Sequence, residues 1–278
     1  MAEDRIDVGR GGVARSALAA QYGDGGANLV TRTGVYRYVV GAGDAAFDFP
    51  GWVLDHHLWR GEETVADVGC GPGHYVEALA GRARRVAQLD LSPAMVAACR
   101  RRRAGAQVVA DAARLPLGAA SVDVVLAAHM LYHVARIDDA LAEARRVLRP
   151  GGSLLVALNG VADKAEILSL WQDAGRAVLG AGFDAPNWSA RANLDNVPGL
   201  AGAHFGSVSV DRLPGRFRFP ASDPVLAWVQ SLRAGTEDVV ADAEWDAVVA
   251  ELRRRLEERL GREGALVVTK DSGVVVAR

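Results

Sequence analysis

Short apolar runs alternate with amphipathic stretches from residue 62 onward. Between these runs, the segment 92–103 has Ser92 as a helix N-cap and Pro93 at the first helical position, and 137–148 places its apolar residues on one helical face. Strands that are apolar almost throughout and alternate with helices are typical of a mainly parallel sheet covered on both faces. The predicted strands of this part are 64–68, 85–90, 107–111, 122–128 and 153–158.

The regular alternation weakens after residue 159. The pattern predicts a helix over 163–180, a polar loop over 184–202 and a strand over 204–213. Two further helices follow within 221–260, and the apolar runs ALVVTK and GVVVAR end the chain as strand-like segments. We therefore predict an α/β, Rossmann-like, doubly wound and mainly parallel sheet of seven strands, with the helices of 221–260 inserted between the last two strands.

The N-terminal part has a different character. Residues 1–12 are predicted to be a flexible tail, and residues 13–60 contain short helical patterns interrupted by glycines, with no strand pattern. We predict three units: 1–60 as an N-terminal helical cap segment, 61–220 with 261–278 as the Rossmann-like core, and 221–260 as a helical lid. The cap and the lid are expected over the carboxyl edge of the sheet.

Composition narrows the function classes. Half of the 278 residues are hydrophobic, which excludes disorder over most of the chain, and the formal net charge of −2 disfavours a protein that binds nucleic-acid backbones. Only two residues are lysine, which we interpret as a compositional bias toward arginine. The two cysteines have no metal-site spacing, and no long apolar segment is present, so a cytoplasmic, soluble and reduced protein is expected.

The most informative segment is VADVGCGPG (65–73), in which a buried strand leads into a turn with three glycines and then a helix. Glycines allow a tight turn and close approach of a ligand to the backbone. The dinucleotide fingerprint is incomplete because His74 occupies its last glycine position, and the lysine of a phosphate-binding P-loop is absent. Asp67, just before the loop, disfavours a pyrophosphate and suits a cationic ammonium group.

Two more carboxylates end the next two strands. Asp90 follows Gly69 by 21 residues, where a carboxylate can accept hydrogen bonds from both ribose hydroxyls. Asp111 ends the third strand, a position suited to an adenine amino group, although it is also a possible helix cap. The three acids together fit an adenosine that carries an amino-acid tail.

These segments resemble the class I S-adenosylmethionine-dependent methyltransferases. The matching pieces occur in family order over residues 62–158: VADVGCGPGHY, VAQLDLSPAMV, VVADAARLPL, SVDVVLAAHMLYHV and ALAEARRVLRPGGSLLVA. The HMLYHV run with RVLRPGG is similar to the small bacterial enzymes of the ubiquinone/menaquinone-methyltransferase-like branch. The resemblance implies S-adenosyl-L-methionine as cofactor, with S-adenosyl-L-homocysteine as its product.

The resemblance also implies the cofactor contacts. It assigns the methionine part to Asp67, Gly69, Gly71 and Gly73, the ribose to Asp90, Leu91 and Ser92, the adenine to Asp111 and Ala112, and the sulfonium to Ala128 and His129. In related enzymes the N-terminal segment closes over the donor. Tyr22, Arg37 and Tyr38 are therefore candidates for that role, with surface packing as the alternative.

Candidate catalytic residues are His129 and His133, which follow the fourth strand where the acceptor approaches. Histidine can titrate near neutral pH and act as a general base, but the same run could also serve packing. The acidic pair Asp138-Asp139 is better explained as the start of a helix than as a metal site, so no metal is predicted.

The sequence therefore predicts methyl transfer to N, O or C of a small molecule, with a bacterial secondary metabolite as the expected acceptor. An RNA or protein methyltransferase and a non-catalytic regulatory protein that binds the donor are the alternatives. We expect neither nucleic acid nor membrane as a partner, and a monomer or a homodimer.

Overall fold

The computed structural model describes residues 22, 26–41, 47–102, 105–233 and 240–278. These residues form a sheet of eight strands in the order β1-β7-β8-β6-β5-β2-β3-β4. The strands are β1 (Val39–Val40), β2 (Thr64–Val68), β3 (Arg85–Asp90), β4 (Ala106–Val109), β5 (Val122–Ala128), β6 (Leu148–Asn159), β7 (Val208–Phe219) and β8 (Leu266–Ala277).

The sheet is parallel in its centre and antiparallel at one side. Strands β2 to β6 pair in parallel, whereas β8 pairs antiparallel with both β6 and β7. This confirms the predicted Rossmann-like α/β class. The predicted strand number of seven was wrong, because β1 adds an eighth strand through antiparallel pairing of Val39 with Phe217 and Val40 with Arg216. A strand of two residues has no periodic signal, so only its partner β7 reveals it.

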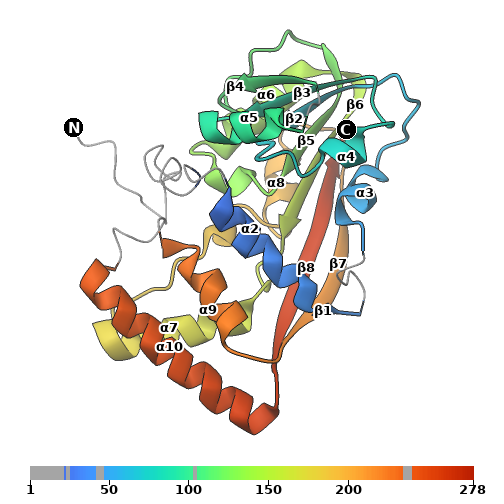
Figure 1. Cartoon of the computed structure of the whole chain (residues 1–278). Helices are drawn as coiled ribbons and strands as arrows, with labels where there is room; N and C mark the ends of the chain where they lie inside the picture. Colours follow the sequence, from blue (N-terminus) through green and yellow to red (C-terminus); the bar gives the residue numbers. More distant parts are fainter. Residues whose placement is uncertain (1–21, 23–25, 42–46, 103–104, 234–239) are drawn as a thin grey trace, which may run out of the picture.

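Helices cover both faces of the sheet (Figure 1). The α-helices are α2 (Ala27–Thr33), α3 (Phe49–Leu54), α4 (Val76–Leu79), α5 (Pro93–Arg100), α6 (Ile137–Val147), α7 (Ala165–Leu179), α8 (Val197–Ala201), α9 (Asp223–Gln230) and α10 (Asp242–Glu263). The 3-10 helices are η1 (Gly34–Tyr38), η2 (Leu131–His133) and η3 (Trp188–Ala190).

Alternation along the central strands builds a core on each face. In β5, Val125 and Ala127 pack in the cluster with α6 and α8, whereas Val124 and Leu126 pack in the cluster with α3 and α4. Successive side chains of a strand point to opposite faces, so a continuous apolar run can bury both of them.

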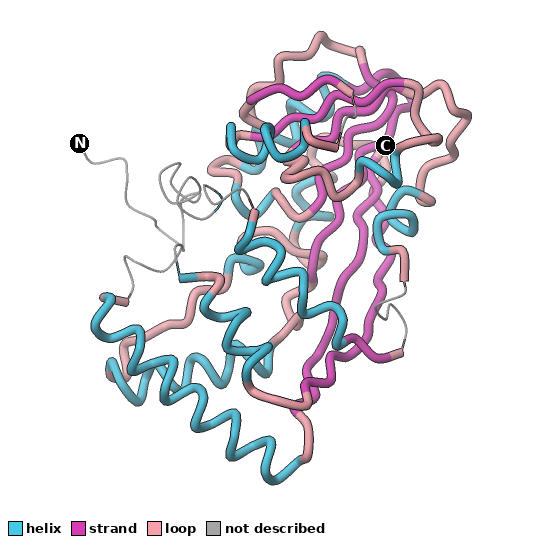
Figure 2. Tube along the Cα trace, in the orientation of Figure 1, coloured by secondary structure: helices cyan, strands magenta, loops and turns pink. Residues whose placement is uncertain are grey.

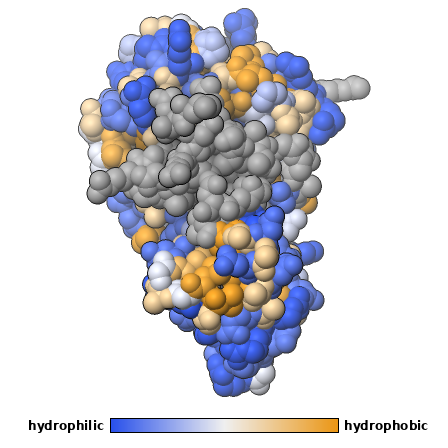
Figure 3. Space-filling view, turned by 90° about the vertical axis from the view of Figure 1, so that its left-hand side faces the viewer, coloured by the Kyte–Doolittle hydropathy of each residue, from blue (hydrophilic) through white to orange (hydrophobic). Residues whose placement is uncertain are grey.

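A third core joins the helices α7, α9 and α10 to one end of β7 and β8. Trp171 and Trp245 meet edge to face, with ring centroids 6.1 Å apart, above Phe217 and Phe219 of β7. In Figure 1 this helical part lies at one end of the long strands, and α2 lies between it and the carboxyl ends of the parallel strands. Figure 3 shows apolar side chains gathered on the face of this part that turns toward the viewer.

Several boundaries differ from the prediction because β6, β7 and β8 are each twelve residues long (Figure 2). β6 already begins at Leu148 and includes the Pro-Gly-Gly turn signal, and the two closing runs form one strand. The register from Val208 opposite Ala277 to Phe219 opposite Leu266 holds the polar residues of this ribbon in extended form. The predicted polar loop 184–202 also contains η3 and α8.

The insertion of α9 and α10 between β7 and β8 agrees with the predicted order of elements. The predicted tail 1–12 lies outside the described residues, as does most of the helical pattern that follows it. None of the helices in the described part of the chain combines the length and the apolar character needed to cross a membrane.

Candidate active site

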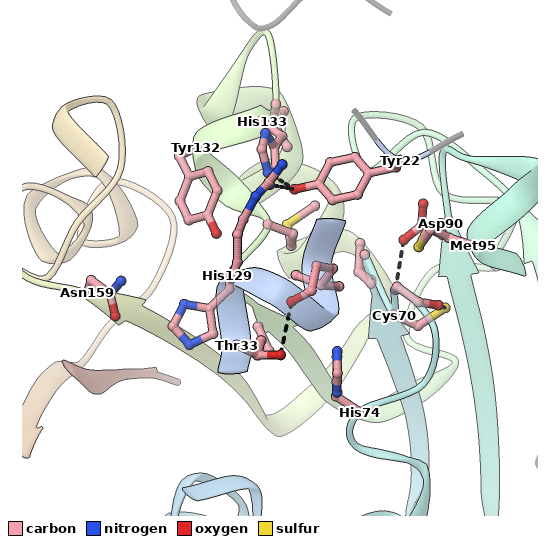
Figure 4. A pocket seen from close by; sticks show the side chains of 18 of the residues that line it. Tyr22, Thr33, Cys70, His74, Asp90, Met95, His129, Tyr132, His133 and Asn159 are labelled. Carbon is pink, nitrogen blue, oxygen red and sulfur yellow. Dashed lines mark hydrogen bonds between the residues drawn. The ribbon is translucent and has the colours of Figure 1, made fainter. Parts of the chain in front are cut away.

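A cavity of about 840 Å³ lies at the carboxyl ends of β2, β3 and β5 and continues along β6 and β8 beneath α2 and α9. Ligand-binding cavities usually measure about 300–1,000 Å³, so this one lies in the upper part of that range. Its walls come from segments far apart in the chain, and Figure 4 shows side chains from several of them directed toward a shared space.

The glycine turn forms one wall. Gly69 has φ 69° and donates its N–H to the carbonyl of Leu89 at 2.7 Å, and Gly71 has φ 53° and donates to Oδ2 of Asp90 at 2.9 Å. Gly69 and Gly71 line the cavity. Gly73 does not line it, and its contact with the cofactor stays a prediction. A Cβ at Gly73 would lie 2.9 Å from Cγ2 of Val76, so this glycine serves the packing of the turn.

Asp90 is held by the backbone around it. Its two carboxylate oxygens accept hydrogen bonds from the N–H groups of Gly71 at 2.9 Å and Ser92 at 2.8 Å. Burial raises the pKa of Asp90, and these two hydrogen bonds oppose that rise. Ser92 caps α5 by accepting from the N–H of Met95, and Leu91 and Ser92 both line the cavity. Each oxygen of Asp90 retains a lone pair for a ligand hydroxyl.

The adenine-side candidates also line the cavity. Asp111 accepts a hydrogen bond from the N–H of Ala113 at 3.0 Å, and Ala112 lies next to it. The structure thus brings Asp67, Asp90 and Asp111 to one cavity, at or just after the ends of the neighbouring strands β2, β3 and β4.

Asp67 is an exceptional carboxylate. It is 1% exposed, and no described residue hydrogen-bonds its Oδ2. Burial, with a smaller contribution from the charge of Asp90, raises the pKa of Asp67 to about 7. A buried carboxylate without a donor is unfavourable, and an ammonium group in the cavity would supply both the charge and the hydrogen bond. This orphaned oxygen fits the amino end of the implied cofactor.

Ala128 ends β5 and His129 follows it, and both line the cavity. His129 has φ 52° and donates its backbone N–H to the carbonyl of Ala157 at 2.8 Å. A left-handed backbone is rare for a residue with a side chain, and such residues cluster at functional sites. Burial lowers the pKa of His129 to about 4, so its imidazole is neutral near pH 7. Figure 4 shows this ring between Asn159 and His74.

His133 lies in a more crowded position. Its Nε2 is 2.8 Å from the hydroxyl of Tyr22, with which it hydrogen-bonds, and the Tyr132 ring lies 4.5 Å away between centroids. Burial lowers the pKa of His133 to about 3. The ring is therefore neutral, and the nitrogen nearest to Tyr22 is already engaged. This arrangement supports a positioning role more than proton transfer.

The predicted N-terminal residues divide into two groups. Tyr22 lines the cavity, but Arg37 and Tyr38 do not, and the role of this group over the donor stays a prediction. The Arg37 guanidinium lies over the Tyr38 ring at 5.3 Å, and that ring packs on Phe219 at 5.1 Å. In a 3-10 helix residues three apart share a face, so Tyr38 follows buried Val35 toward the helical core.

Tyr36 and Arg32 are among the cavity residues of this segment that the sequence analysis missed. Arg32 donates to the carbonyl of Ser231 at 2.8 Å and to the hydroxyl of Tyr22 at 3.4 Å, which connects α2 to the end of α9. The sequence held no signal that distinguishes Tyr36 from Tyr38. Which of the two side chains lines the cavity depends on the residue at which the 3-10 helix begins.

The cavity has a second polar end away from the glycine turn. Its residues include Trp228 and five that the sequence analysis did not connect with a site, Asn159, Asp163, Lys164, Lys270 and Ser272. A signal did exist, since Lys164 and Lys270 are the two lysines of the chain. Composition alone did not connect them, because they lie more than a hundred residues apart.

Comparisons with known proteins agree with this geometry. Residues 66–156 match the family described as a methyltransferase domain. The chain is 41% identical over 120 residues to an uncharacterized 37.1 kDa protein in transposon TN4556 of Streptomyces fradiae, a match that covers 41% of this chain and 35% of that protein.

A longer match is to the malonyl-[acyl-carrier protein] O-methyltransferase of Methylococcus capsulatus, 29% identical over 214 residues and covering 74% of each chain. Among solved structures, phosphoethanolamine N-methyltransferase 2 of Haemonchus contortus with S-adenosylhomocysteine has a TM-score of 0.55 at 16% identity. That match covers 95% of this chain and 59% of that one. It supports the fold alone.

The matches to the first two curated relatives span only about 35–44% of the length of those proteins. The finer resemblance to the ubiquinone/menaquinone branch stays a prediction. The domain match nevertheless spans the glycine turn, the strand-end carboxylates and β5, the same stretch that carries the motifs in family order. Residues 66–156 of this chain therefore form a methyltransferase domain, and the motifs of this stretch resemble those of the class I S-adenosylmethionine-dependent methyltransferases.

Proposed function

We propose that this protein transfers the methyl group of S-adenosylmethionine to N, O or C of a small-molecule acceptor that enters the same cavity. The observation that carries the proposal is the combination of strand-end carboxylates at one end of the cavity with a separate polar end at the other. A protein that only binds the methyl donor would need the carboxylate end of the cavity but not the second polar end. We include in the proposal that the acceptor is a bacterial secondary metabolite.

The donor end has residues for each part of the cofactor. Asp67 would bind the ammonium group, Asp90 the ribose hydroxyls and Asp111 the adenine amino group. Gly71 leaves open space, since a Cβ there would meet nothing closer than Leu29 at 3.9 Å. When bound, the cofactor supplies an already activated methyl group on a sulfonium. The protein therefore has mainly to position the acceptor and exclude water.

His129 is the proposed acid–base residue, because it lies between the two ends of the cavity and its ring is neutral near pH 7. A neutral imidazole can accept the proton of an attacking hydroxyl or amine. His133 is proposed to act through Tyr22, which it holds in place by their hydrogen bond. Together with Arg32, that contact keeps α2 over the cavity.

The remaining parts of the proposal concern partners. A net charge of −2 supports a small acceptor over a nucleic acid. The relative named malonyl-[acyl-carrier protein] O-methyltransferase supports O-methylation as one possible chemistry. A cytoplasmic location and a monomeric or dimeric state are also proposed.

Calorimetric titration with S-adenosylhomocysteine tests the proposal. We expect one binding site per chain and, with S-adenosylmethionine and a panel of candidate metabolites, a mass gain of one methyl group on the true acceptor. Adenosine is the matched control, and it should bind more weakly because it lacks the ammonium that Asp67 would contact. A folded protein that binds neither cofactor form would contradict the proposal. Binding with no acceptor methylated in a broad screen would favour the regulatory alternative.

The pH dependence of binding gives a further prediction for Asp67. Its pKa of about 7 lies above the ordinary value, and an ammonium ligand binds the ionised form better. Binding therefore releases a proton, and affinity for S-adenosylhomocysteine should rise with pH, by up to about ten-fold per unit below pH ~7. Titrations at several pH values measure this slope. An Asp67→Asn variant should bind weakly with a flat profile, and a wild-type affinity that is flat or falls with pH would refute the assignment.

A further inference from the structure

Lys164 and Lys270 are the only lysines in the chain, although Lys and Arg together number 32. Both are buried, at 5% and 2% exposure, and both line the polar end of the cavity. A lysine ammonium is a compact charge with three donors, whereas arginine presents a broad planar fork. The chain uses arginine for almost all of its positive charges, yet both of its lysines lie at this end of the cavity. We therefore interpret these two lysines as functional rather than as a result of compositional bias.

Lys164 has a carboxylate partner within the protein. It forms an ion pair with Asp163, and its Nζ lies 4.9 Å from the centroid of the Phe217 ring and 5.4 Å from that of Tyr36. Asp163 also accepts the backbone N–H of Asp271 at 3.0 Å. A charge with a carboxylate partner and aromatic faces around it is a stable part of the wall.

Lys270 has a different environment. Within the described part of the chain its Nζ donates one hydrogen bond, to the carbonyl of Leu213 at 3.0 Å, and has no carboxylate within ion-pair distance. The two acids nearby have their own cations, Lys164 for Asp163 and Arg212 for Asp271 at 2.6 Å. A buried ammonium with two further donors and no anion is unfavourable unless a ligand supplies the acceptor atoms.

Two polar neighbours of Lys270, Asn159 and Ser272, lie beside the hydroxyl of Tyr36. Asn159 of β6 stands opposite Ser272 of β8, and Lys270 precedes Ser272 by two residues on the same face of the strand. The Asn159 Oδ1 and the Ser272 Oγ are buried without a hydrogen bond of good geometry within the described residues, and the Tyr36 hydroxyl is the side-chain group that interacts with both residues. We call Asn159, Lys270 and Ser272 the distal polar patch. Figure 4 shows Asn159 beyond His129 as seen from Asp90.

The position of the patch separates it from the proposed donor end. β8 and β2 are three strand spacings apart in the sheet order, with β6 and β5 between them. Neighbouring strands are about 4.8 Å apart, so Lys270 and Asp67 lie on strands about 14 Å apart. A group that binds the patch while the donor occupies its own end is therefore most simply part of the second substrate.

We infer that the distal polar patch binds an anionic oxygen group of the methyl acceptor, a carboxylate or a phosphate, and that Lys270 determines this specificity. The inference rests on the proposed function and deepens it. Lys270 would donate to the anion, and Asn159 and Ser272 would bind the polar groups beside it. The apolar part of the acceptor would lie along Leu213 and Trp228 and place its nucleophile near His129.

The test uses the full chain saturated with S-adenosylhomocysteine and three ligands that share a ring: benzoate, phenyl phosphate and the neutral benzamide. Calorimetry should give at least one anion about ten-fold or more tighter than benzamide, the effect of a charge-assisted hydrogen bond in a buried site. The stronger of the two anions identifies the carboxylate or the phosphate. Lys270→Met should remove the difference, and so should Lys270→Gln, which keeps a donor without the charge.

Three results would overturn the inference. The first is that the anions and benzamide bind equally well. The second is that no anion binds to a protein that still binds S-adenosylhomocysteine. The third is that folded Lys270→Met loses affinity for S-adenosylhomocysteine, which would assign the lysine to the donor site. Wild-type binding decides the question even where a variant does not fold. A wild-type protein that fails to bind S-adenosylhomocysteine would instead refute the proposed function.

Discussion

Asp90→Ala is expected to weaken S-adenosylhomocysteine binding by about a hundred-fold or more. The carboxylate is positioned by the N–H groups of Gly71 and Ser92, so each oxygen has one remaining direction for a ribose hydroxyl. A hydrogen bond to a charged group contributes about 1.5–3 kcal/mol, and two of them correspond to a factor of about a hundred or more. Alanine also removes the acceptor that holds Gly71, which loosens the turn.

Calorimetry on both proteins measures the loss, and a thermal unfolding curve shows whether the variant is folded. Asp138→Ala is the matched control, because that carboxylate is exposed and contacts His204 outside the cavity. It should bind as the wild type does. Folded Asp90→Ala with affinity within ten-fold of the wild type would show that the ribose is bound elsewhere.

The predictable part of the fold is the part whose strands are buried on both faces. Strands 64–68 and 122–128 match the observed β2 and β5 in both bounds, because a continuous apolar run between two helical layers has one stable solution. The cap at Ser92 was equally readable, since a serine followed by proline satisfies the first turn locally. Because the helix start at Ser92 and Pro93 is readable, it also placed the end of the preceding strand at Asp90.

The parts that were not predictable depend on pairing between distant segments. β1 exists only against β7, and the facing of Tyr36 against Tyr38 depends on the register of a short 3-10 turn. Lys270 reaches the cavity because β8 is one strand of twelve residues, aligned so that Ser272 meets Asn159. The two apolar runs that the sequence shows there do not reveal that register.

The glycine turn allows a comparison of two substitutions that differ in their surroundings. Gly69 and Gly71 both have positive φ, so alanine at either position strains the backbone by about 1 kcal/mol. The two positions differ in the space available for a side chain. A Cβ at Gly69 would lie 2.5 Å from the Cβ of Met130, whereas at Gly71 the nearest atom is 3.9 Å away. Overpacking in a tight site adds about 1–3 kcal/mol.

We therefore expect Gly69→Ala to lower the free energy of unfolding by about 2–4 kcal/mol and Gly71→Ala by only about 1 kcal/mol. Urea unfolding followed by tryptophan fluorescence measures both. Met130 sits at the end of β5 next to His129, so relief of the clash would displace the wall that carries the proposed base. Equal losses at the two glycines would mean that Met130 moves aside freely, and that the turn and the β5 wall are not tightly packed against each other.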